Sequence, residues 1–325
     1  MSVCVKYIIP LLSAAILVTA ILAYELRVHV FPADLSFPEL IALAPANSTL
    51  IAYIDLAELR KEPLIGHLAA LAEPVTVDPD YEQFVRSTGF DYQRDLDQVV
   101  IAAAGEEKMA IADGRFERKK IEEYALRSGA MEKRNGRTIY FVKSKTRGQT
   151  VSLTFLSAHR IVLGEGTDLT GYLTSPAATL DPAMRQRLSR VAGSPVFAGW
   201  KIPDSLTHAA DGKAPFGLPA LQSLRAMDLA IKPEAQQLLV SVEGECEDSQ
   251  QAQNLSASLD LLRTILPAGL AEPPKGPKKR GNMSAENAAL TARLAQATEI
   301  TTNNDRVRLL LTVSPDMIGA LAPTK

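Results

Sequence analysis

Alternating apolar and polar positions predict paired β-strands that are followed by amphipathic helices. Val99–Ala103 is an apolar run, and in Ala110–Phe116 the residues Ala110, Ala112, Gly114 and Phe116 share one face by alternation, on the other side of the turn Gly105-Glu106. A period of two is typical of strands with one buried face. In Asp248–Ile265 the apolar residues instead recur every three or four positions, which predicts a helix that packs on a sheet. Antiparallel hairpins with helices packed on them indicate an α+β fold.

The same order of elements occurs twice along the chain, which predicts two related units in tandem at residues 47–178 and 179–325. Tyr53 in the first opening strand corresponds to Trp200 in the second, and Gly114 corresponds to Gly244 after the hairpin. The order strand, helix, two strands, helix, strands is that of a split βαβ, ferredoxin-like unit, here with an extra β-hairpin. Asp55 is expected to cap the first helix, with Glu58 three residues later as in a capping box.

The first repeat has additional residues within Glu73–Asp97, whereas the second is longer between Leu266 and Asn287. Residues that occur in only one repeat can form a surface that binds a partner. For the aromatic residues among them, packing in the core is the simpler role. The candidate partner surface consists of Tyr81, Phe84, Phe90, Asp91 and Tyr92. The longer loop of the second repeat carries Lys275, Lys278, Lys279 and Arg280, which are either solvated or in contact with anionic headgroups.

The N-terminal segment, residues 1–28, predicts a transmembrane helix over residues 7–24. Tyr7–Tyr24 contains no charged residue and would extend about 27 Å as a helix, close to the roughly 30 Å of the bilayer core. Lys6 and the amino terminus favour a cytoplasmic N-terminus, which places the remaining chain outside the cytoplasmic membrane. Residues 29–46, rich in proline, read as a tether. A cleaved signal peptide, which would yield a secreted protein, is the alternative.

Composition excludes several classes of protein. Lys and Arg number 35 against 37 Asp and Glu, so the chain has no basic footprint for nucleic acid. The two cysteines, Cys4 and Cys246, cannot build a disulfide scaffold or a cysteine-ligated zinc cluster. Cys246 is expected to be a packing residue.

Candidate catalytic and cofactor motifs have simpler structural explanations. Gly164-Glu165-Gly166 precedes a helix, but Leu169 stands where a dinucleotide fingerprint needs its third glycine. His29, His67, His159 and His208 form no paired helical spacing. Asp91, Asp95 and Asp97 are close in sequence, yet aspartates before a strand are typical of turns and caps. We therefore expect no catalytic residue, no cofactor and no bound metal.

The stretch Thr88–Asp97, followed by Gly114-Arg115-Phe116 and its helix, resembles a group of uncharacterised bacterial exported or membrane-anchored proteins. The resemblance implies a location outside the cytoplasm and implies no activity.

The leading hypothesis is a non-enzymatic, single-pass, membrane-anchored periplasmic protein that binds or scaffolds a protein or another envelope component. The alternative is an envelope hydrolase or small-molecule-binding protein with its site between the two repeats, since ligand sites favour domain interfaces. A third hypothesis is assembly of copies through sheet edges.

Overall fold

The computed structural model describes residues 37–65, 79–134, 136–143, 148–166, 169–174, 180–203, 219–234, 236–271 and 285–317. These residues form two compact units. The first unit holds the described residues up to Glu62 and from Pro79 to Trp200; the second holds mainly those from Lys201 onward. The predicted membrane segment, residues 7–24, and the basic loop with Lys275, Lys278, Lys279 and Arg280 lie outside the described residues. Residues 29–36 of the predicted tether also lie outside them, whereas residues 37–46 are described and include the helix Phe37–Ala42, in which Leu40 is buried.

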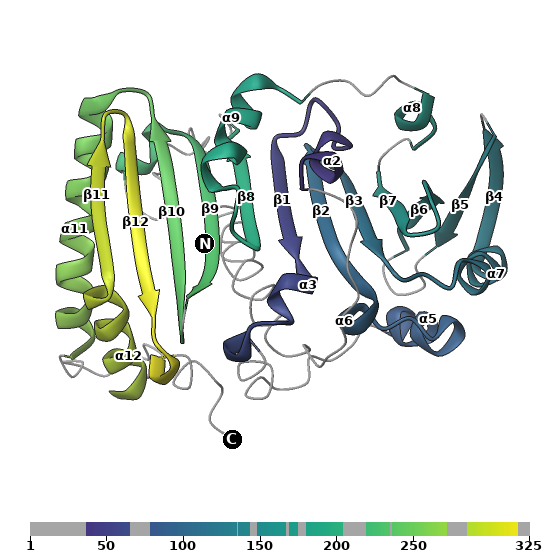
Figure 1. Ribbon diagram of the computed structural model, residues 1–325. Coiled ribbons are helices and arrows are strands. Elements are labelled where there is room, and N and C mark those ends of the chain that lie inside the picture. The colour runs from purple at the N-terminus through teal and green to yellow at the C-terminus, as the bar shows by residue number, and fades with distance from the viewer. Residues whose placement is uncertain are drawn as a thin grey trace. The chain divides into compact units, whose positions relative to one another are not determined.

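The first unit contains an antiparallel sheet in which neighbours along the chain are often neighbours in space (Figure 1). Its strands run β8-β1-β2-β3-β7-β6-β5-β4, and each adjacent pair is antiparallel. The strands are β1 (Leu50–Asp55), β2 (Leu96–Ala104), β3 (Glu107–Gly114), β4 (Gly129–Arg134), β5 (Arg137–Lys143), β6 (Thr150–Phe155), β7 (Arg160–Glu165) and β8 (Val196–Lys201).

Helices accompany this sheet at its connections. They are α2 (Phe37–Ala42), α3 (Leu56–Leu59), α5 (Pro79–Thr88), α6 (Tyr92–Asp95), α7 (Arg118–Ser128), α8 (Leu169–Thr174) and α9 (Pro182–Val191). Helix α7 packs on β4 and β5 and buries Ile121 and Ala125 against Tyr140, Leu153 and Phe155. The spacing of Ile121 and Ala125, one helical turn apart, aims both side chains at the sheet.

The second unit pairs its strands in the order β11-β12-β10-β9, again antiparallel throughout. Its elements are η2 (Pro219–Ser223), β9 (Leu224–Glu234), β10 (Gln237–Cys246), α11 (Ser249–Ala271), α12 (Ala285–Gln296), β11 (Thr298–Asn303) and β12 (Arg306–Val313). Helix α11 contacts β10, β11 and β12, and Figure 1 shows it running along this sheet. Its buried residues Ala252 and Leu255 are two of those predicted to face a sheet.

The predicted α+β class with antiparallel hairpins is confirmed, while the ferredoxin-like order is wrong in one respect. A ferredoxin-like unit separates its first two strands by another strand, but β1 pairs directly with β2 in antiparallel register. After the hairpin, α7 leads into β4, and the strands β7, β6 and β5 lie between β3 and β4. In the second unit β10 and β11 are parallel, with β12 between them.

Local turn and cap chemistry is as the sequence predicts. Asp55 caps α3, and its Oδ1 accepts a hydrogen bond of 2.8 Å from the Glu58 N–H. Gly105 has a φ of 64° in the β2–β3 turn, a conformation that favours glycine. Among the residues that the structure describes, every helix is too short or too polar to span a bilayer.

Candidate functional site

The segment predicted to carry the partner surface folds as two helices, α5 and α6, that precede β2. Thr88 ends α5 with its hydroxyl, which donates to the Phe84 carbonyl at 2.8 Å and accepts from the Phe90 N–H at 3.2 Å. Gly89 then reverses the chain with a φ of 71°. Asp91 caps α6, because its Oδ1 accepts from the Gln93 N–H at 3.1 Å. The segment is therefore ordered by its own backbone contacts.

The aromatic residues of this segment form a continuous chain of ring contacts that reaches the core of the first unit. Tyr81 lies 5.5 Å from Tyr92, and Phe84 lies 5.7 Å from Phe90, both edge to face. Phe90 stacks on Phe116 at 5.8 Å. Edge-to-face and offset arrangements suit the quadrupole of aromatic rings. The chain ends at Phe155, whose ring lies 6.2 Å from that of Phe116.

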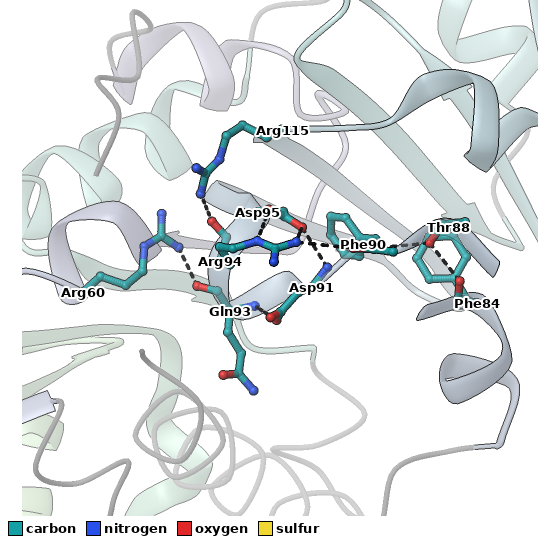
Figure 2. A network of polar contacts seen from close by, with 10 residues as sticks. Arg60, Phe84, Thr88, Phe90, Asp91, Gln93, Arg94, Asp95 and Arg115 are labelled. Atoms are coloured by element: carbon teal, nitrogen blue, oxygen red, sulfur yellow. Dashed lines mark hydrogen bonds and ion pairs between the residues drawn. The ribbon is translucent and has the colours of Figure 1, made fainter. Parts of the chain in front are cut away.

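Arginine side chains fasten the segment to the rest of the unit (Figure 2). Arg60, from the end of α3, donates to the carbonyls of Gln93 and Leu96 and to Asp97 Oδ1, the latter at 2.6 Å. The Arg60 side chain is only 5% exposed. A guanidinium can serve three acceptors at once because its five N–H groups form a rigid fork.

Asp95 makes the second set of hydrogen bonds that hold the segment in place. Its carboxylate accepts from Arg94 Nε and from the Asp91 N–H at 2.8 and 2.9 Å, and its carbonyl accepts from the Arg115 N–H at 2.7 Å. A Cβ on Gly114 would meet that same Asp95 carbonyl oxygen, so this position requires glycine.

Asp95 and Asp97 have pKa values displaced in opposite directions. Burial opposes ionisation of Asp95, but the hydrogen bonds from Arg94 and the Asp91 N–H prevail and lower its pKa. Burial raises the pKa of Asp97, and the neighbouring charges of Arg60 and Arg115 offset this only in part. Both carboxylates act as anchors of the turn, which agrees with the turn chemistry expected from the sequence.

The five residues of the predicted partner surface thus divide by their contacts. Phe84 and Phe90 pack against core residues of the first unit. Asp91 is a helix cap. Tyr81 and Tyr92 are half-buried and contact each other at the outer end of the aromatic chain. Glu82, Arg86 and Arg94 are exposed around them.

A second polar constellation, which sequence reasoning missed, crosses the sheet of the first unit. Register places Asp55 opposite Gln98, Gln98 opposite Asp113, and Asp113 opposite Arg160. Arg160 binds Asp113 through two hydrogen bonds of 2.7 and 2.9 Å. Gln98 Nε2 donates to Asp55 Oδ2 at 3.1 Å, as does the Tyr53 hydroxyl. We call Asp55, Gln98, Asp113 and Arg160 the cross-strand row.

The cross-strand row is shielded from solvent. Gln98 and Asp113 are 7% and 4% exposed. Burial, together with the Asp55 carboxylate, raises the pKa of Tyr53, and burial raises that of Tyr172, whose hydroxyl donates to the Leu43 carbonyl at 2.7 Å. Protonated hydroxyls and a bidentate ion pair hold elements together but provide no activated nucleophile.

Of the remaining residues singled out from the sequence, Gly166, His159 and Cys246 occupy turns or the core. Cys4, His29, His67 and His208 lie outside the described residues. Gly166 follows β7 with a φ of 67°, and His159 lies in the β6–β7 turn, where its N–H donates to Ser157. Cys246 is a buried thiol, and burial raises its pKa. Within the described ranges, no three His, Cys, Asp or Glu side chains gather in a group able to hold a metal ion.

Comparison with known proteins gives a distant structural likeness only. No family model matches the chain, and no curated protein matches it. Three crystal forms of TP0453 are similar in structure, each with 14% sequence identity. Forms I, III and IV have TM-scores of 0.43, 0.46 and 0.47, and the matches cover 89, 91 and 86% of this chain and 97, 98 and 94% of those chains. Likeness at this level carries no argument about function.

Proposed function

We propose that this chain is a non-enzymatic, single-pass, membrane-anchored protein that binds or scaffolds an extracytoplasmic protein or envelope component. The charge-free run over residues 7–24 supports the anchor, and the surface around Tyr81 and Tyr92 supports the binding role. The proposed partner surface retains the residues Tyr81, Phe84, Phe90, Asp91 and Tyr92, with the two tyrosines outermost.

The rigid presentation of Tyr81 and Tyr92 is the observation that carries the proposal. The backbone around Tyr92 is held by the buried contacts of Arg60 and Asp95, and the ring of Tyr81 packs on that of Tyr92, so little conformational entropy remains to be lost on binding. Tyrosine and arginine are enriched in interfaces, where tyrosine supplies a large contact area with a polar tip. The exposed Arg86 and Arg94 lie on the same two helices as the tyrosines, α5 and α6.

Site-specific photo-crosslinking in living bacteria tests the binding role. A photoreactive amino acid replaces Tyr92 in the full chain, and the matched control replaces Lys120, an exposed residue of α7. We expect discrete adducts from position 92 that disappear when Tyr81→Ser is added. Absence of adducts, or the same adducts from position 120, would contradict the proposal.

We also infer that the two units descend from one duplicated α+β unit. Both contain a hairpin, then a helix, and a final hairpin whose last strand inserts beside the first hairpin, as β7 pairs with β3 and β12 with β10. The first unit has an additional hairpin, β4–β5, between the helix and the final hairpin. Gly114 and Gly244 occupy corresponding positions, and an added Cβ at either would meet a close neighbour. These likenesses support the duplication proposed from the sequence.

The basic residues Lys275, Lys278, Lys279 and Arg280 are proposed to contact anionic headgroups, on their charge alone. Replacing all four with glutamine should reduce binding of the full chain to vesicles that contain phosphatidylglycerol and leave binding to neutral vesicles unchanged.

A further inference from the structure

Strand β4 forms an open edge of the sheet in the first unit. Among the described strands it pairs with β5 alone, and most of its residues are exposed. The loop between Arg134 and Arg137 closes the hairpin, so these two residues form its first pair. Hydrogen-bonded and non-hydrogen-bonded pairs alternate from there along an antiparallel ladder. The backbone groups of Gly129, Met131 and Lys133 therefore point away from β5.

An apolar pair borders this edge. The exposed large hydrophobic side chains of the described residues are Leu126, Met131, Leu261 and Ile265, and the first two belong to α7 and β4. Leu126 is 47% exposed and Met131 is 51% exposed. Met131 is opposite Tyr140, which packs in the core beneath α7, so Met131 lies on the same face of the sheet as α7. An open backbone edge and exposed apolar area thus coincide.

We propose that β4 is a dimerisation edge that pairs in antiparallel fashion with β4 of a second copy of this chain around a two-fold axis. Met131 of one copy faces Met131 of the other on that axis. The pairing extends the sheet and covers Met131 and Leu126 with the same residues of the second copy. A two-fold contact of this kind is isologous and closed, so the β4 edges of both copies become paired and neither remains open.

Charge and apolar contact together favour this register. With Met131 on the axis, Lys133 is opposite Gly129 and Glu132 is opposite Ala130, so no like charges face each other. Sliding the second copy by two residues in one direction would place Glu132 opposite Glu132, and sliding it further would place Lys133 opposite Lys133. Sliding it in the other direction would place Gly129 opposite Met131, so the two Met131 side chains would no longer cover each other. Like charges directly opposite each other destabilise a strand pair.

This edge and the surface around Tyr81 and Tyr92 have different residues. The edge consists of residues of β4 and α7, and the tyrosines belong to α5 and α6, although α5 packs on α7. Loss of dimerisation and loss of photo-crosslinks at Tyr92 are therefore distinguishable results.

Disulfide trapping of the full chain in detergent tests the register. The variants M131C and K133C are made in a C4S background, in which the remaining Cys246 is buried. Facing residues of a hydrogen-bonded pair have Cα atoms about 5.5 Å apart, within the range of a disulfide. The two copies of residue 133 would be about 14 Å apart at 3.4 Å per residue. We expect a disulfide dimer from M131C and none from K133C; no dimer from M131C, or equal dimers from both, would overturn the proposal.

A charge-swap experiment separates dimer loss from misfolding. M131E and M131K each place like charges on the two-fold axis, so each alone should dimerise at least about tenfold more weakly than the natural chain by analytical ultracentrifugation. An equimolar mixture of the two should recover the dimer, which a misfolded variant would not do. Dimers of M131E alone at natural strength, or masses that keep growing beyond the dimer, would overturn the proposal.

Discussion

At the scale of single residues, the first unit places charged groups in its interior and pairs each of them closely. Asp113 and Arg160 form a bidentate pair between neighbouring strands, and Arg60 and Asp97 form an ion pair with one hydrogen bond beside α3. Burying a charge is unfavourable unless a partner and hydrogen bonds compensate it. Replacing one residue of such a pair should therefore lower the free energy of unfolding, because the other residue keeps its charge in the interior without a partner.

The variant Asp113→Asn should be strongly destabilised. It removes the negative charge but leaves the Arg160 guanidinium, 13% exposed, between the strands. Loss of one member of a buried pair costs about 3–5 kcal/mol, whereas an exposed pair contributes about 0–1 kcal/mol. Glu82→Gln, which breaks the exposed pair with Arg86, is the matched control. Urea unfolding followed by the fluorescence of Trp200, the single tryptophan, measures both; equal midpoints would refute the argument.

Asp95 should make stability depend on pH in a defined direction. Its pKa is lowered in the folded state, despite burial, by the hydrogen bonds from Arg94 and the Asp91 N–H. A lowered pKa means that the stabilisation is complete above the unfolded-state value of about 3.9 and is lost as pH falls through the folded-state value. The difference in unfolding free energy between the natural chain and Asp95→Asn should therefore be largest at neutral pH and shrink below about pH 4. A difference that grows on acidification would contradict this assignment.

At the scale of elements, Arg60 links α3 to the turn between α6 and β2. This link determines how rigidly the proposed partner surface is held. The Arg60 guanidinium serves the carbonyls of Gln93 and Leu96 and the carboxylate of Asp97. The same geometry explains why Asp97 remains paired although burial raises its pKa.

The variant Arg60→Lys should loosen this turn even though it keeps the positive charge. An ammonium on a flexible stem cannot reach three acceptors held in the planar arrangement of a guanidinium. We expect at least about tenfold faster amide hydrogen exchange in residues 91–97, equivalent to about 1.4 kcal/mol of local opening, with exchange in β5 and β6 unchanged. Unchanged exchange at 91–97 would show that the aromatic chain alone holds the segment.

The sequence predicts the elements better than it predicts their partners. The β2–β3 turn at Gly105, the Asp55 cap and the α7 and α11 helices follow from local patterns, because turns, caps and helical periodicity depend on nearby residues. The cross-strand row depends instead on which strands are neighbours and in what register. Asp113 and Arg160 are 47 residues apart in the chain, and no local pattern relates them. The ferredoxin-like order failed for the same reason.

At the scale of the whole molecule, two α+β units follow one N-terminal apolar run, and each has a first hairpin, a helix and a last strand that inserts beside that hairpin. Under the proposed duplication, the first unit has gained α5 and α6, which precede its first hairpin. The aromatic chain shows how such a gain is accommodated, since its inner rings join the existing core.

The proposed anchor makes a prediction for the complete chain in cells. With residues 7–24 embedded and the N-terminus in the cytoplasm, alkaline phosphatase fused after Lys325 should be active, because that enzyme needs an oxidising compartment to form its disulfides. The chain should remain with the membrane after carbonate extraction and have the mass of the uncleaved sequence. Replacing Leu12 and Ile16 with arginine should release it from the membrane, because each arginine at mid-helix costs about 2.5–3.5 kcal/mol of insertion. A shorter, carbonate-soluble product of the natural chain with an active fusion would instead establish cleavage of a signal peptide, and an inactive fusion would place the folded units inside the cell.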